Sequence, residues 1–325
     1  MEYRTSNRTG LKTSAIGLSL GGLERHEKNL IITTLTTAAE EGTNFLLIPA
    51  LAVKSVVGAC VGDWLQVQKR ANYVLGIAIG SSHEWTGGGA GAGRAYPPTT
   101  FTPTEVEANL VQTMARLQVD YLDVLLLPPL HLEDLSNPLL CEKIRLWKEA
   151  GVVKTVAATF NSLFDVLAAI RSEHTVPLLD YISIRHNFYN SQLTSKALSE
   201  LNNLGLAVFV QDPLAGGSLL GSTAHLQSVE QSFLNQLLWK GQVVTTELLG
   251  DYFSPKGVTM TQAALRYCLD IVGVTSVLVD VATVGSSRLQ EVYKTLRLPP
   301  LTHSELVDVR HLIDPDYARG EKGAN

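Results

Sequence analysis

The stretch that decides the fold is YLDVLLLPP, residues 121–129. Its run of apolar residues lacks the polar alternation of a strand with one exposed face, which is typical of a parallel strand buried on both faces. Two prolines end the run, because proline has no N–H to give to a sheet. A helical pattern precedes it, with Val106, Leu110 and Leu117 on one face. This unit predicts helices that alternate with parallel strands.

Seven further apolar runs of this kind occur along the chain, each separated from the next by a helical pattern. Eight strands that alternate with helices predict a (β/α)8 barrel. We expect residues 1–325 to form one barrel domain, with a hairpin around residues 7–10 at the amino end of the barrel. The predicted strands are residues 14–20, 44–48, 73–79, 121–127, 153–159, 180–185, 206–211 and 276–280.

Helix starts are marked by residues whose side chains cap free backbone N–H groups. Two of them have a glutamate three residues later, Glu105 or Glu305, which makes a capping box. The predicted N-cap residues are Thr102, Asn137, Ser162 and Thr302.

The segment of residues 81–102 interrupts the alternation with a glycine-rich sequence that has no periodicity. It follows the third predicted strand, at the end of a barrel where active sites are built. It predicts a mobile lid that carries His83 and Trp85, or else plain disorder, and the sequence favours neither. No helix opens directly after its glycines and no Lys-Ser/Thr follows, so it is no phosphate-binding loop.

Composition excludes several classes of protein. The net charge is −5 and no cluster of Lys and Arg occurs, so we expect no nucleic-acid partner. The three cysteines are scattered without metal-ligand spacing, which predicts neither a metal site nor a disulfide framework. The sequence shows no signal peptide and no apolar run near 18 residues, so we expect a cytoplasmic protein without a membrane partner. The oligomeric state stays open.

Several motifs resemble those of the aldo-keto reductases, in the family's order and across essentially the whole chain. The opening Tyr3-Arg4 with residues 11–18, and the run MARLQVDYLD at residues 114–123, are similar to the family pattern. So are PLAGG at residues 213–217 and LRLPPL at residues 296–301. The resemblance implies a barrel that reduces carbonyls with NADPH, using Asp, Tyr, Lys and His at strand ends, where tyrosine donates the proton.

The positions of those four catalytic residues carry apolar side chains here. The resemblance places them at Leu47, Ala52, Ala78 and Pro128. Residues 45–53 contain neither Asp nor Tyr, and no lysine occurs between Lys69 and Lys143. Without a hydroxyl acid, hydride transfer would leave an alkoxide that nothing neutralises. We therefore expect that redox chemistry has been lost.

The cofactor positions that the resemblance implies have changed as well. Thr159-Phe160 stands for a Ser-Asn pair, Ser183 for a glutamine, and Gln211 for the aromatic residue that stacks on nicotinamide. Asp280 begins the run that would hold a phosphate, and its charge would repel one. Arg288 is the remaining candidate for a phosphate contact. We expect no cofactor, with NADPH as the alternative.

The favoured hypothesis is a non-redox enzyme that cyclises, isomerises or dehydrates a hydrophobic small molecule, where positioning supplies much of the rate. Family context suggests secondary metabolism as its setting. His186 and Asp212 follow the sixth and seventh strands and are expected to face each other as an acid–base pair. His131 and His83 are further catalytic candidates. The expected substrate-binding residues are Glu24, Leu47, Leu51, Trp85, Pro128, Phe160, Asn187 and Tyr189.

Two other functions stay open. A pseudoenzyme that binds a partner or a ligand is favoured by a collapsed barrel mouth and an exposed apolar patch. A carbonyl reductase with an unusual proton donor is favoured by tight NADPH binding.

The orientation of Arg185 in the sixth predicted strand also stays open. Arg185 either faces the barrel interior, where its charge would need a partner, or faces the helices beside an acidic residue.

Overall fold

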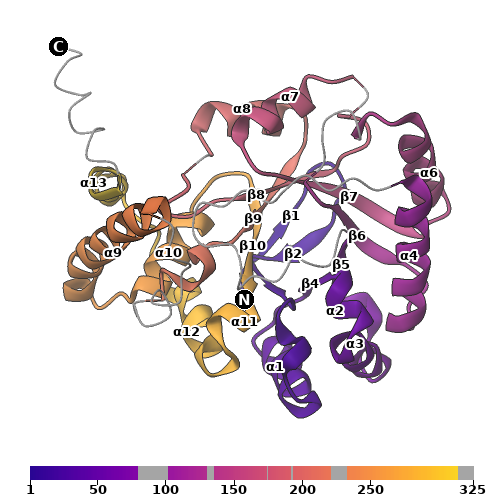
Figure 1. Ribbon diagram of the computed structural model, residues 1–325, viewed down its shortest axis with the longest axis horizontal. Coiled ribbons are helices and arrows are strands. Elements are labelled where there is room, and N and C mark those ends of the chain that lie inside the picture. The colour runs from indigo at the N-terminus through magenta and orange to yellow at the C-terminus, as the bar shows by residue number, and fades with distance from the viewer. Residues whose placement is uncertain (80–101, 130–134, 174, 192, 221–232, 314–325) are drawn as a thin grey trace.

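A computed structural model describes residues 1–79, 102–129, 135–173, 175–191, 193–220 and 233–313. Eight parallel strands close into a barrel in the order β10-β3-β4-β5-β6-β7-β8-β9. This architecture confirms the predicted (β/α)8 barrel (Figure 1). The strands are β3 (Ile16–Ser19), β4 (Phe45–Pro49), β5 (Val74–Ala78), β6 (Leu122–Leu127), β7 (Val153–Phe160), β8 (Tyr181–Arg185), β9 (Ala207–Gln211) and β10 (Val274–Asp280).

Each of the eight predicted strands is confirmed. The expected hairpin is also present, with β1 (Tyr3–Thr5) paired antiparallel to β2 (Lys12–Ser14). Its Arg4 donates a hydrogen bond from Nη1 to the carbonyl oxygen of Val274 at 2.8 Å, which ties the hairpin to the start of β10. The hairpin therefore lies at the amino end of the barrel. The glycine-rich segment expected as a lid falls almost wholly outside the described residues.

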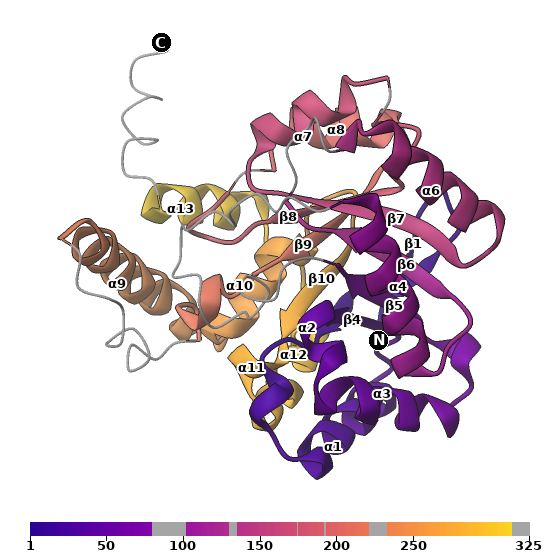
Figure 2. The same ribbon diagram turned by 45° about the vertical axis from the view of Figure 1, so that its right-hand side comes forward.

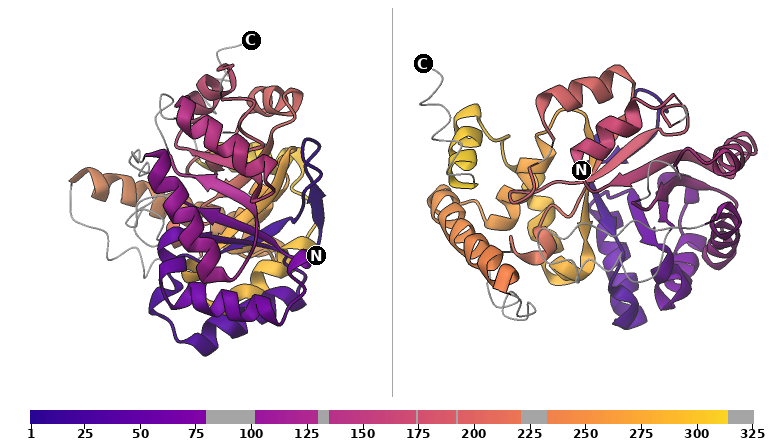
Figure 3. Two further views of the ribbon diagram at one scale, coloured as in Figure 1. Left: turned by 90° about the vertical axis from the view of Figure 1, so that its right-hand side faces the viewer. Right: turned by 45° about the horizontal axis from the view of Figure 1, so that its top comes forward.

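Helices surround the barrel on its outer side (Figures 1 and 2). Two of them, α9 and α13, lie next to each other at the periphery (Figure 3). Tyr252 of α9 donates a hydrogen bond to Asp308 of α13, and Lys256, just after α9, pairs with Glu305. The helices are α1 (Lys28–Glu40), α2 (Ala50–Lys54), α3 (Val56–Gln66), α4 (Pro103–Leu117), α6 (Pro138–Glu149), α7 (Leu163–Ile170), α8 (Ser195–Asn203), α9 (Phe233–Phe253), α10 (Met260–Leu269), α11 (Val281–Val284), α12 (Leu289–Lys294) and α13 (His303–Ile313).

The four predicted helix starts are confirmed by their capping hydrogen bonds. Thr102 Oγ1 accepts from the Glu105 N–H while Glu105 accepts from the Thr102 N–H, which is the expected capping box. Thr302 makes the same arrangement at the start of α13. Asn137 and Ser162 cap α6 and α7 with their side-chain oxygens. These caps satisfy N–H groups that the helices leave unpaired.

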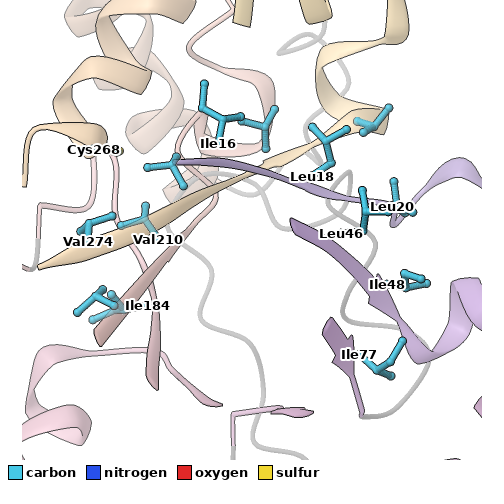
Figure 4. Packing of buried hydrophobic residues seen from close by; sticks show 14 of the residues in the cluster. Ile16, Leu18, Leu20, Leu46, Ile48, Ile77, Ile184, Val210, Cys268 and Val274 are labelled. Atoms are coloured by element: carbon cyan, nitrogen blue, oxygen red, sulfur yellow. The ribbon is translucent and has the colours of Figure 1, made fainter. Parts of the chain in front are cut away.

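Two hydrophobic layers hold the barrel together. The outward side chains of the strands pack against the helices, as Ile16, Leu18, Leu46 and Ile48 do (Figure 4). The inward side chains fill the barrel itself. There the ring of Tyr181 stacks on Phe209 with centroids 4.3 Å apart, and the centroid of Phe45 lies 4.9 Å from that of Phe209.

The small residues of the inner wall make room for these rings. A Cβ atom at Gly76 would lie 2.9 Å from Cε2 of Phe45, so only glycine allows the phenyl ring to lie against β5. Side chains fill the barrel interior from its amino end to the middle of the strands. The place for a site is therefore the carboxyl end of the barrel.

The amino end is fastened by a buried carboxylate, Asp123 on β6. Its Oδ2 accepts from Arg70 at 2.8 Å and from the Leu75 N–H at 2.9 Å, and its Oδ1 accepts from Lys154 at 2.9 Å. This set joins β5, β6 and β7 through one side chain.

Among the helices that the structure describes, none has the length and apolar character needed to cross a membrane.

Candidate functional site

Strand alternation determines which side chains point into the carboxyl end of the barrel. Leu47, Ala78, Leu126, Ala157, Tyr181, Phe209 and Leu278 belong to the interior cluster. Every second residue of a strand faces the same way, so the inward positions nearest the carboxyl end follow from these. They are Ser19, Pro49, Ala78, Pro128, Thr159, Arg185, Gln211 and Asp280.

The wall formed by β4, β5 and β6 is apolar. Leu47 and Ala78 are buried in the interior cluster, and Pro128 is buried directly after β6. Ala52 in α2 is fully buried. These four positions, where the family resemblance implies the catalytic residues, therefore offer no proton donor on this wall. The side chain of Leu51, another expected substrate contact, lies outside the description.

The wall formed by β8, β9 and β10 is polar and holds a buried ion pair. Arg185, whose side chain is 4% exposed, contacts Asp212 with Nη2 2.8 Å from Oδ2. Of the two orientations open to Arg185, the structure has the inward one with an acidic partner. This places a guanidinium and a carboxylate at the carboxyl end.

The loop after β9 fixes Asp212 firmly. Its backbone has φ 51°, a left-handed conformation that is uncommon for a residue other than glycine. Its Oδ1 accepts from the Gly216 N–H, and its carbonyl oxygen accepts from Asn187 Nδ2 at 2.8 Å. Burial raises the pKa of Asp212, while the charge of Arg185 and the Gly216 N–H oppose that rise. Asp212 is thus held as the partner of Arg185.

Two hydroxyl groups lie on or next to this wall. Ser183 accepts a hydrogen bond from Gln211 Nε2 at 2.7 Å. Thr159 at the end of β7 is 1% exposed, and its buried Oγ1 has no hydrogen-bond partner within the described parts of the chain. A buried hydroxyl group that makes no hydrogen bond costs about 1–3 kcal/mol of folding free energy.

Asp280 ends β10 and caps α11. Its Oδ1 accepts from the Ala282 N–H at 2.9 Å and from the Thr283 N–H at 3.4 Å. The pKa of Asp280 is raised to about 7, mainly by burial and also by the charges of Asp212 and Glu24, while the two hydrogen bonds act to lower it. Near neutral pH this carboxyl group is therefore able both to give and to take a proton.

His186 does not lie where the sequence analysis expected it. Its ring stacks on Tyr267 of α10 with centroids 5.3 Å apart, and its Nδ1 accepts from the Leu193 N–H at 3.4 Å. Burial lowers the pKa of His186 to about 4. Because Arg185 points inward, the next residue points to the helices, so His186 and Asp212 do not face each other as expected.

The remaining expected site residues lie mostly around this end. Asn187 is buried and accepts from the N–H groups of Tyr189 and Asn190. The hydroxyl of Tyr189 hydrogen bonds to that of Thr246 in α9. Phe160 is buried among the outward residues, against the helices.

Glu24 follows β3, and its Oε1 is buried without a partner among the residues that are described. His83, Trp85 and His131 lie outside the described residues.

The residues that sequence reasoning underweighted are Asp280, Thr159 and Arg185. The sequence places Asp280 among the polar groups near strand ends but assigns it no catalytic role. All three can be found from strand alternation. Counting in steps of two from a bulky interior residue toward the end of the strand leads from Leu278 to Asp280 and from Tyr181 to Arg185. Within the described part of the chain, no cluster of three His, Cys, Asp or Glu residues could hold a metal ion.

Comparison with known proteins defines the class. The family model described as the aldo/keto reductase family matches residues 50–314, and the chain belongs to this family.

Among solved structures, it is similar to the aldo-keto reductase AKR11C1 from Bacillus halodurans. The apo form matches with 18% identity and a TM-score of 0.70, and the holo form with 17% identity and a TM-score of 0.69. In both cases 96% of this chain and 96% of the other chain are covered. At this identity the likeness concerns the fold. A search among curated proteins finds no match.

The fold family implies a nicotinamide cofactor, and several described residues do not fit one. Arg288 donates to Glu291 and to the carbonyl oxygen of Leu220, so its guanidinium is already used within the protein. The N–H groups at the start of α11 are taken by the carboxylate of Asp280, where a phosphate would meet a like charge. Gln211 offers no ring for stacking.

Proposed function

We propose that the protein is a cofactor-independent acid–base enzyme that isomerises, cyclises or dehydrates a small molecule with an apolar skeleton. The observation that carries the proposal is the position of Asp280, a half-buried carboxyl group at the inward end of β10. In the closed strand order, β10 lies across the barrel from β6, so Asp280 is opposite Pro128 and the apolar wall. A proton-transfer group thus faces a surface suited to hold hydrocarbon.

Each of these reactions needs one group that moves a proton twice. In an isomerisation or cyclisation, the Asp280 carboxylate takes a proton from one substrate atom and returns it to another. In a dehydration, the protonated carboxyl group gives its proton to the departing hydroxyl, which leaves as water, and then takes a proton from the adjacent carbon. A pKa of Asp280 near 7 suits both directions.

The apolar wall contributes binding and orientation. Leu47, Ala78 and Pro128 offer no hydrogen bonds, so they would hold the skeleton by shape and exclude water from the reacting atoms. The Arg185–Asp212 pair keeps the loops after β8 and β9 in place beside Asp280. Positioning of this kind supplies a large part of the barrier reduction.

A second candidate is an NADPH-dependent carbonyl reductase with an unusual proton donor. Family membership favours it, because the structural relatives are named as reductases and one of them is a holo form. In that case Asp280 is the group available to protonate the alkoxide. A protein that binds a ligand without turnover is the third candidate.

Product masses distinguish the three candidates. Wild-type protein and Asp280→Asn are incubated with a panel of small cyclic alcohols, ketones and terpenoids, with and without NADPH, and the products are separated by gas chromatography and analysed by mass spectrometry, so that retention time identifies an isomer of unchanged mass. We expect wild-type protein without NADPH to give products of unchanged mass or lacking one water, and Asp280→Asn to give none. Products that gain two hydrogens only with NADPH would establish the reductase, and binding without any product would establish the ligand-binding protein.

A further inference from the structure

Thr159 carries a hydroxyl group that no described residue uses as a hydrogen-bond partner. It is 1% exposed, and its Oγ1 is buried without a hydrogen-bond partner in the part of the chain that is described. Its neighbour across the register is Ser183, whose hydroxyl accepts from Gln211 instead. Valine has nearly the same shape and no polar atom, so packing alone would be served better by valine.

The position of Thr159 is the boundary between the two walls. On one side, the register of β6 and β7 pairs Leu127 with Ala158, and its continuation places Pro128 beside Thr159. On the other side lie β8 and β9 with Ser183, Arg185 and Gln211. A molecule whose apolar skeleton lies on the first wall would present its first polar atom here.

The charges at this end do not favour an anion. Arg185 is paired with Asp212, and the acids Asp212 and Glu24 both lie close enough to Asp280 to raise its pKa. A carboxylate or phosphate on the ligand would meet more negative than positive charge.

We propose that Thr159 is a specificity-determining residue whose hydroxyl hydrogen bonds to the carbonyl or hydroxyl oxygen of an uncharged substrate with an alicyclic or similarly apolar skeleton. The inference rests on the proposed function in placing the substrate at the carboxyl end of the barrel.

The test compares Thr159→Val, which keeps the shape, with Thr159→Ser, which keeps the hydroxyl. Ligand-observed NMR measures the binding of cyclohexanone, cyclohexanol and cyclohexanecarboxylate to the full chain, and thermal unfolding measures Tm without ligand. We expect the ketone and the alcohol to bind wild-type protein and Thr159→Ser, and to bind Thr159→Val roughly fivefold more weakly. The carboxylate should bind more weakly than the ketone. The Tm of Thr159→Val should equal or exceed that of the wild type.

Four results would overturn the inference. Three concern binding: ketone binding by Thr159→Val equal to that of the wild type, carboxylate binding tighter than ketone binding, and no ketone binding by the wild type. The fourth is a Tm that is lowered in Thr159→Val but not in Thr159→Ser, which would show a protein partner for the hydroxyl. A fifth is nicotinamide mononucleotide binding that depends on Thr159, which would assign the hydroxyl to a cofactor. Asp280→Asn separates the two proposals. If it turns substrate over like the wild type, the proposed function fails while Thr159-dependent ketone binding still supports this inference.

Discussion

At the scale of the residue, Asp280 is kept inside the barrel although burial disfavours its charged form. Its pKa of about 7 lies above the ordinary value of 3.8 expected in the unfolded chain. A native pKa above the unfolded one means that the free energy of unfolding falls as the pH rises from about 4 to about 7. A carboxyl group that lowers stability at neutral pH and is nevertheless present points to a use for its proton.

The variant Asp280→Asn tests this directly. Asparagine still offers an oxygen to cap α11 but carries no charge, so we expect the variant to match the wild type near pH 4. At pH 8 it should be more stable by about 2 kcal/mol, after allowance for solvent screening. Urea unfolding across this pH range measures the difference, and the titration of His186, common to both proteins, cancels. A difference that does not change with pH would contradict the raised pKa.

The Arg185–Asp212 pair gives a second prediction at this scale. Replacing Arg185 with Met leaves the Asp212 carboxylate without its charged partner, so we expect a loss of about 3–5 kcal/mol in the free energy of unfolding. The double variant Arg185→Met with Asp212→Leu removes both charges and should lose less than Arg185→Met alone. Denaturant unfolding of the two singles and the double gives the coupling energy. Purely additive losses would show that the two residues act independently.

Residue-scale predictions from the sequence succeeded unevenly, and the reason is strand parity. The apolar character of the ends of β4, β5 and β6 could be predicted from the sequence, because it depends on residue identity alone and not on a partner elsewhere in the chain. The pairing of His186 with Asp212 failed, because one residue beyond Arg185 the side chain turns to the helices. The partner of Arg185 could not be known, since it is set by the left-handed turn at Asp212 after another strand.

At the scale of the element, the strands could be predicted because burial on both faces leaves long apolar runs. The helix starts were predictable because capping chemistry is local, as at Thr102 and Asn137. The exact ends of β3 and β10 shifted from the prediction by two residues at most, where pairing between distant strands decides the boundary. Local sequence signals therefore predict the elements. The residues that face the barrel interior follow only when the strand alternation is counted along each strand.

Asp123 joins three strands at the amino end and supplies the prediction for this scale. We expect Asp123→Ala to lose about 3–5 kcal/mol of stability, because the buried Leu75 N–H would lose its acceptor and Arg70 and Lys154 would lose their carboxylate partner. The matched control is Asp120→Ala, which removes an exposed carboxylate three residues earlier and should change stability by less than about 0.5 kcal/mol. Equal losses in both variants, measured by urea unfolding, would contradict a special role for Asp123.

At the scale of the whole molecule, the barrel has an apolar wall and a polar wall at its carboxyl end. The apolar wall occupies β4 to β6, and the polar wall occupies β8 to β10, with Thr159 on β7 between them. The barrel of the family is retained, and the positions at which the resemblance implies the groups for hydride chemistry carry apolar residues. This division is the basis for proposing acid–base chemistry on an uncharged molecule.

The most direct test of that account is calorimetric titration of the wild-type protein with NADPH. The account predicts no saturable heat at cofactor concentrations into the millimolar range, because Asp280 occupies the start of α11 and Arg288 is held by Glu291 and Leu220. Saturable binding, followed by oxidation of the bound NADPH when a carbonyl compound is added, would contradict it and establish a reductase.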